Sequence, residues 1–99
     1  MNGVYIMEKD YFLDRSYAST ENYLLHIGDV VYICEKHMQK TAKELKDLTK
    51  GTIVQKLTSS LQHPCGVKVK IKTKEGRLAI GRVTYLCDEN GEPLRTNRN

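Results

Sequence analysis

The chain has 99 residues, 39% hydrophobic and 28% charged, which is enough for one small domain and too few for two independent cores. Its net charge of +4 favours polyanionic partners, nucleic acid above all. No apolar run approaches the ~20 residues that span a bilayer, and the N-terminus lacks a signal-peptide pattern. We therefore expect a cytoplasmic protein with no membrane partner.

The first part of the chain predicts an extension followed by a strand. Residues 1–22 carry several aromatic side chains without sustained periodicity, so we expect them to be either loosely ordered or docked on the domain. The domain itself is predicted over residues 23–87. After a turn at Gly28 and Asp29, the β-branched and aromatic residues 30–34 predict its first strand.

Residues 36–49 break the strand pattern. Met38, Ala42, Leu45 and Leu48 follow spacings of four, three and three, which gathers them on one face of a helix. Gly51 lies where a C-terminal helix cap belongs. The sequence predicts a short amphipathic helix inserted after the first strand, and a long hairpin loop is the alternative.

Three more strands are predicted, over residues 51–58, 66–73 and 78–87, with a turn-rich polar tail over 88–99. In the third strand, three apolar residues alternate with three lysines, so the two sets face opposite sides. Gly81 indicates a bulge or bend in the fourth strand. Short strands with tight turns and no βαβ alternation predict a mainly β fold, a small SH3-like antiparallel barrel of four to five strands with one inserted helix.

The second half also resembles a family. The matching positions are Leu48 to Gly51, then Leu57, Thr58, Ser60, His63, Pro64, Gly66, Val67, Lys68 and Val69, then Gly81 to Val83. Over residues 27–84 the chain is similar to the small bacterial YwbE-like proteins, whose core pattern is H-P-x-G-[IV]-K-V. That family has no established activity, so the resemblance implies a compact bacterial cytoplasmic domain and no particular reaction.

Metal and catalytic sites are disfavoured. The three cysteines are widely spaced and odd in number, so free thiols are expected in place of a disulfide framework. A zinc site is poorly supported, because the available residues lack two tight ligand pairs; they are Cys34, His37, His63, Cys65, Cys87 and His26. Cys65 beside His63 lacks the third, orienting group of a nucleophilic site. We expect no metal, no cofactor and no enzymatic activity.

The lysine alternation is the main functional signal. Lysines two residues apart on a strand lie ~7 Å from one another on one face, and such a row can make several phosphate contacts. The candidate nucleic-acid-binding residues are Lys50, Lys56, Lys68, Lys70, Lys72, Arg77, Arg82, His63 and Tyr32. The alternative for the lysines is a solvated face that blocks edge aggregation. For His63, the proline and glycine beside it favour a structural role in its loop over a phosphate contact.

The predicted function is a non-enzymatic RNA-binding module, with ribosome association as one form. The rival prediction is a protein-interaction module in which the basic face meets an acidic protein partner, or in which the N-terminal aromatic segment carries the contact.

Overall fold

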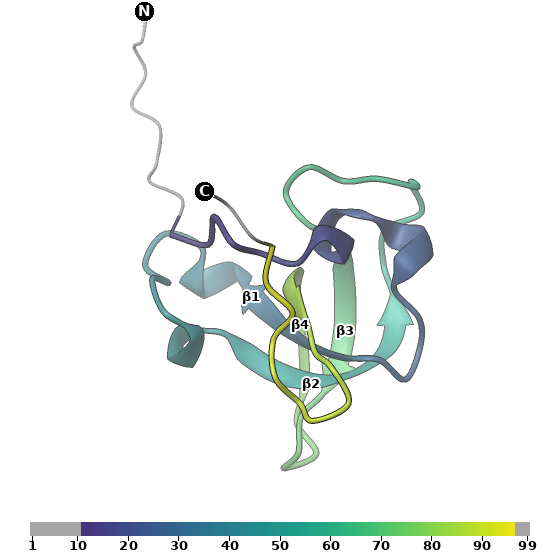
Figure 1. The fold of residues 1–99 in the computed structure, drawn as a ribbon. Helices are drawn as coiled ribbons and strands as arrows, with labels where there is room; N and C mark the ends of the chain where they lie inside the picture. Colours follow the sequence, from purple (N-terminus) through teal and green to yellow (C-terminus); the bar gives the residue numbers. More distant parts are fainter. Residues whose placement is uncertain (1–10, 97–99) are drawn as a thin grey trace, which may run out of the picture.

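The computed structural model describes residues 11–96. The predictions for the start of the extension and the end of the tail therefore lie outside the described residues. Within 11–96, four strands form a closed antiparallel barrel (Figure 1): β1 (Val30–Glu35), β2 (Thr49–Lys56), β3 (Lys68–Lys72) and β4 (Leu78–Leu86). The barrel closes because β1 pairs with both β2 and β4. The predicted mainly β fold, a small antiparallel barrel, is confirmed.

The barrel core consists of aliphatic side chains from alternate strand positions. Alternation places every second residue of a strand on the inner face. The fully buried aliphatic residues of this core are Leu25, Val31, Ile33, Ile53, Val67, Val69 and Ile71, and Val83 is almost fully buried. The three lysines of β3 consequently point outward, as the alternation predicts.

A bulge in β4 creates a second apolar cluster outside the barrel. Tyr32 pairs with Tyr85 whereas Ile33 pairs with Val83, so Thr84 is an extra residue in β4. The extra residue reverses the facing of the strand beyond it. Tyr85 is buried, but it packs in an outer cluster with Phe12, Ala42 and Leu48 and not in the barrel core.

Gly81 does not form the bulge that the sequence suggested. It pairs in continuous register with Glu35 on β1 and Val69 on β3. A Cβ at this position would lie 2.4 Å from the Cys34 carbonyl oxygen. Gly81 is therefore the point where β1 and β4 approach too closely for a side chain.

The single helix predicted over residues 36–49 is not formed. Two separate 3-10 turns occupy the segment, η3 (Lys36–Met38) and η4 (Leu45–Asp47). The N–H groups of Lys43 and Glu44 donate to the Asp47 carboxylate at 3.0 and 3.1 Å, and Glu44 is extended. Lysines repeated at three- and four-residue spacing repel one another on a helix, and so short a helix is marginal in water.

The apolar residues of that segment nevertheless gather as the spacing predicted. Ala42 and Leu48 are buried in the outer cluster, and Met38 and Leu45 pack against it. The sequence pattern thus gave the correct buried side of the segment but the wrong backbone.

The two terminal segments lie side by side across the barrel (Figure 1). The Ser16 hydroxyl donates to the Leu94 carbonyl and accepts the Leu86 N–H at 2.8 Å. The Thr96 N–H donates to the Asp14 carbonyl at 3.0 Å. Residues 11–22 and 88–96 therefore belong to the packed domain.

The 3-10 turns η1 (Tyr17–Thr20) and η2 (Asn22–Leu24) connect the N-terminal segment to the loop between β2 and β3. The Val67 N–H donates to the Ser19 carbonyl, and the Asn22 N–H donates to the Leu61 carbonyl, both at 2.8 Å. These bonds fix the shape of the loop over residues 57–67.

Candidate nucleic-acid interface

The outer face of β3 presents a lysine row, which we define as Lys68, Lys70 and Lys72. Lys68 and Lys72 are exposed and Lys70 is partly exposed, while Val69 and Ile71 between them are fully buried. Among residues 11–96 the ion pairs are His26–Asp29, Lys46–Glu44, Arg77–Glu35 and Arg95–Asp14. Within the described part of the chain, no carboxylate therefore neutralises the lysine row.

Two other predicted cations, Lys50 and Arg77, have partners within the fold. The Lys50 ammonium donates to the Gly91 carbonyl at 2.8 Å and lies 5.5 Å from the centre of the Tyr32 ring. Arg77 forms an ion pair with Glu35 at 3.2 Å, and the Arg77 hydrogen bond, opposed by burial, keeps the pKa of that carboxyl below its usual value.

Lys56 has a structural position at one end of the barrel. The register between β2 and β3 shifts between Ile53 and Gln55, and this second bulge pairs Lys56 with the inward-facing Val69. The Lys56 ammonium donates to the carbonyls of Asn22 and Leu25 at 3.2 and 2.8 Å. Lys56 thus holds η2 and Leu25, the residue after η2, against the barrel. Its ammonium group is engaged there and does not join the lysine row.

The two strand tyrosines lie outside the lysine row. Tyr32 is half-buried and makes an edge-to-face contact with Tyr85, the ring centres being 6.4 Å apart. The Tyr85 hydroxyl donates to the Asp14 carboxylate, which also pairs with Arg95. Burial, reinforced by the Asp14 bond, raises the pKa of Tyr85 to about 12. Both rings therefore stabilise the outer cluster.

His63 lies in the fixed loop between β2 and β3. Its Nδ1 accepts the Cys65 N–H at 3.3 Å, its own N–H donates to the Thr20 carbonyl at 2.9 Å, and its carbonyl accepts the Gly66 N–H at 2.9 Å. Gly66 has a φ of 102° and packs against the backbone of Val83. These contacts fit the structural role that the sequence favoured for His63.

The cysteines are free thiols in the structure. Burial raises the pKa of Cys34 and of Cys87, and a raised pKa makes a thiol a weak nucleophile at neutral pH. Cys65 is exposed. Within residues 11–96, no three His, Cys, Asp or Glu side chains lie together in a way that could hold a metal ion.

A groove of about 1010 Å³ opens beside one end of the lysine row. We call it the basic groove. The N-terminal segment forms one wall with Tyr11, Phe12 and Arg15, and the loop forms another with Pro64 and Cys65. The rest of the lining comes from β1, β3, β4 and the segment after β1, through Cys34, Lys68, Ile80, Gly81, Arg82, Thr84, Lys36, Gln39 and Ala42, together with Thr20 from η1.

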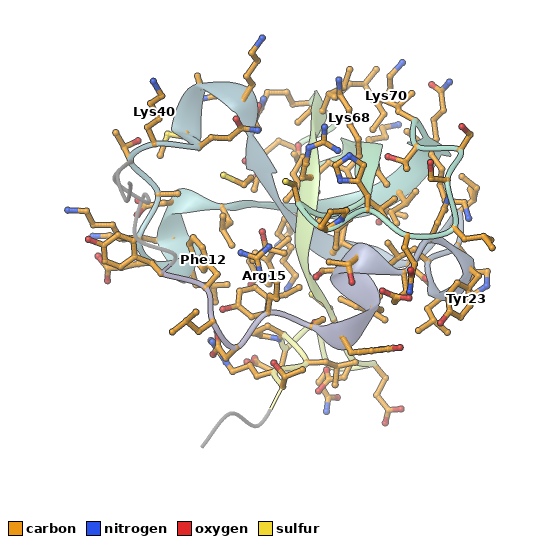
Figure 2. The ribbon with its side chains drawn as sticks, turned by 90° about the horizontal axis from the view of Figure 1, so that it is seen from above. Phe12, Arg15, Tyr23, Lys40, Lys68 and Lys70 are labelled. Carbon is orange, nitrogen blue, oxygen red and sulfur yellow. The ribbon has the colours of Figure 1, made fainter. Side chains whose placement is uncertain are left out.

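Among residues 11–96, the lining of the basic groove carries four cationic side chains and no carboxylate: Arg15, Lys36, Lys68 and Arg82. Arg82 donates to the Gly66 carbonyl at 3.0 Å, and Arg15 donates through Nε to the Phe12 carbonyl at 3.1 Å, so both guanidinium groups are held in place. Figure 2 shows Phe12 and Arg15 on the N-terminal segment and Lys68 above them in the view.

Lys68 and Arg82 were predicted from the sequence, whereas Arg15 and Lys36 were missed. Lys68 pairs directly with Arg82 across β3 and β4. Arg15 and Lys36 come from an extension and a turn whose positions depend on long-range packing. For Lys36, the only indication in the sequence was the high lysine content of residues 36–50. That content shows that the segment is positively charged, but it does not show which part of the barrel the lysines face.

Together the fold and the groove define a class: a small closed β-barrel with a basic groove along one side. Residues 19–86 match the sequence profile of an uncharacterised conserved protein family, DUF2196, and the chain belongs to that family. No curated protein and no solved structure matches the chain. Among the described residues, no helix has the length and apolarity to cross a membrane.

Proposed function

We propose that this protein is a non-enzymatic RNA-binding module that acts in the cytoplasm and contacts the phosphate backbone through its lysine row. The observation that carries the proposal is the lysine row itself, three outward side chains with no carboxylate partner among residues 11–96. Each ammonium that replaces a counterion on a phosphate backbone contributes to affinity and to its salt dependence.

The surroundings of the row support the same proposal. Lys68 also lines the basic groove, where Arg82, Arg15 and Lys36 add positive charge. A continuous positive surface attracts a polyanion and raises its association rate. Such contacts position the backbone without reading base sequence, so weak sequence preference is part of the proposal.

The contacts of His63 in the loop support a non-enzymatic protein. His63 Nδ1 accepts a backbone N–H, so the neutral ring carries its proton on Nε2 and has no second nitrogen that could accept a proton as a general base. The family to which the chain belongs has no assigned reaction. We include two further points in this proposal. The H-P-C-G-V-K-V segment places the protein among the YwbE-like bacterial proteins, and the RNA that it binds belongs to ribosomes.

Charge reversal of the lysine row tests the proposal. A variant with Lys68, Lys70 and Lys72 changed to Glu takes the net charge from +4 to −2. A matched control changes the exposed Lys40, Lys46 and Lys74 to Glu, with the same net charge. Binding of a mixed RNA pool is measured at two salt concentrations by fluorescence anisotropy.

The row variant is expected to lose binding, and the control is expected to retain most of it. Equal losses in both variants would show that net charge alone matters, and no binding by the native chain at low salt would refute the proposal. Binding of an acidic protein with no binding of RNA would favour the protein-interaction alternative.

A further inference from the structure

We infer that the basic groove holds a single nucleic-acid strand, entered from the lysine row, and that it does not accept a duplex. The inference rests on the proposed function and names the form of the nucleic acid and a second contact surface. It assigns a binding role to Lys36, which lies outside the lysine row.

The charge distribution in the groove suits a backbone that bends into it. Arg15 on the N-terminal segment, Lys36 after β1 and Arg82 on β4 approach the same recess from three separate parts of the chain. Glu21 follows the lining residue Thr20 in the chain. Its carboxylate accepts hydrogen bonds from Thr20 Oγ1 at 2.7 Å and from Gln62 Nε2 at 2.9 Å. Among residues 11–96, the lining would present a phosphate with the cations of Lys36, Lys68 and Arg82 and with no carboxylate.

The apolar part of the lining suits unpaired bases. Ile80 is 43% exposed and Pro64 lies on the opposite loop. Tyr11 is 44% exposed, with the Lys43 ammonium 5.7 Å from the centre of its ring. Proteins that bind single strands combine a positive groove with rings or apolar surfaces that bases cover. In a duplex these base faces are stacked on one another and unavailable.

The size of the groove points the same way. Its volume of about 1010 Å³ lies at the upper end of the range for ligand pockets, which is enough for a few nucleotides. Double-stranded RNA is instead recognised across about 16 base pairs of a rigid surface. The inference therefore places a duplex on the lysine row and only a single strand in the recess between the N-terminal segment and the loop.

Lys68 joins the two surfaces. It is the first residue of β3, it begins the lysine row, and it also lines the groove beside its pairing partner Arg82. A strand that follows Lys72, Lys70 and Lys68 therefore arrives at the groove mouth. Figure 2 shows Lys70 and Lys68 next to each other on this side of the molecule, with Arg15 lower in the view.

The chain carries its own reporter for occupancy of the groove. Cys65 is exposed and lines the groove, whereas burial raises the pKa of Cys34 and Cys87, so a thiol reagent reacts first at Cys65. The experiment measures the rate of Cys65 alkylation in the full chain, by mass spectrometry of its peptides. The probes are a single-stranded RNA of about 12 nucleotides, the matched duplex, a mononucleotide and an oligomer of glutamate.

A pair of variants tests the groove independently of the thiol. Lys36→Gln removes a charge from the lining, and Lys40→Gln removes the same charge four residues later, outside the lining. Loss of one single-strand contact reduces the salt slope by ~0.7, equivalent to about a 2.6-fold smaller loss of affinity between 50 and 200 mM salt. Both lysines are exposed, so circular dichroism is expected to show native folding in both variants.

The inference predicts that the single strand slows Cys65 alkylation at least fivefold while the duplex does not, and that Lys36→Gln lowers the salt slope whereas Lys40→Gln leaves it unchanged. Equal protection by the duplex, by the mononucleotide or by the glutamate oligomer would overturn it. Binding that depends on the lysine row, with Cys65 unprotected and Lys36→Gln without effect, would also overturn it yet leave the proposed function standing. If the lysine row does not matter either, both proposals fail.

Discussion

The placement of Lys56 separates structural lysines from binding lysines, and Lys56→Met tests that separation. Methionine keeps the length of the side chain but removes the ammonium that donates to the Asn22 and Leu25 carbonyls at 3.2 and 2.8 Å. Leu25 is fully buried in the barrel core, so this contact anchors a core residue.

The expected loss follows from the two hydrogen bonds. Bonds to a charged group are each worth ~1.5–3 kcal/mol, and the partly solvated end of the barrel reduces the sum. We therefore expect Lys56→Met to lower the free energy of unfolding by about 2 kcal/mol, which shifts Tm down by about 8–16 °C in a domain of this size. The control Lys72→Met, at an exposed position of the lysine row, is expected to change stability by at most ~0.5 kcal/mol.

The two variants are expected to behave in opposite ways in RNA binding. Below its own Tm, Lys56→Met keeps the native salt slope, whereas Lys72→Met lowers that slope by ~0.7. Thermal denaturation by circular dichroism and anisotropy titrations at four salt concentrations measure both quantities. An unchanged Tm together with a lower salt slope for Lys56→Met would refute the structural assignment.

Three further variants test the fold and the loop. Gly81→Ala places a Cβ 2.4 Å from the Cys34 carbonyl oxygen, and is expected to cost ~2–3 kcal/mol by forcing apart the strands that close the barrel; a Tm within 2 °C of native would contradict this close approach. Burial raises the pKa of Asp14, but the hydrogen bonds from Tyr85 and Arg95 outweigh that effect and lower the pKa from its ordinary value of 3.8. The stabilisation by the Asp14 carboxylate is therefore complete above pH ~4 and is lost as pH falls through the lower folded pKa. Asp14→Asn should lower the free energy of unfolding by up to ~1 kcal/mol at pH 7, and the difference from the native protein should become smaller near pH 2. A difference that stays constant in urea titrations from pH 2 to 7 would contradict this role of Asp14. His63→Ala, which removes the acceptor for one loop N–H at 3.3 Å, is expected to lower Tm by a few degrees without altering the RNA salt slope, and a normal Tm with lost binding would make His63 a contact residue.

The sequence predicted the strands because their side chains alternate within short distances along the chain. The strand with the strictest alternation, residues 68–72, is observed with its lysines outward and Val69 and Ile71 fully buried. The other predicted strands are also present, with ends that differ by up to two residues. Local periodicity was sufficient here because each face of a strand meets only one environment.

Features that depend on distant segments were not predictable in this way. The bulge at Thr84 turns the Tyr85 side chain from the inner to the outer side of the barrel. No residue near Tyr85 in the sequence indicates this bulge. Similarly, Lys56 belongs to a basic series by sequence, but a register shift turns it toward carbonyls more than thirty residues away. The helix prediction failed because apolar spacing reports which side is buried and not which backbone conformation buries it.

The candidate site shows the same division. The lysine row follows from alternation alone, whereas the groove requires the N-terminal segment to lie against β4, where the Ser16 N–H donates to the Thr84 carbonyl at 3.0 Å. Arg15 enters the groove through this docking. No local pattern in residues 11–16 indicates the position that their contacts with the barrel give them.

A backbone-amide NMR titration with a single-stranded RNA of about 12 nucleotides tests the central claim most directly. The account predicts that the largest shifts fall on Lys68 and Lys70 of the lysine row and on Lys36 and Cys65 around the groove, and that they diminish as salt is raised. Shifts confined to the exposed tyrosines of η1 and η2, or no shifts at low salt, would contradict the account.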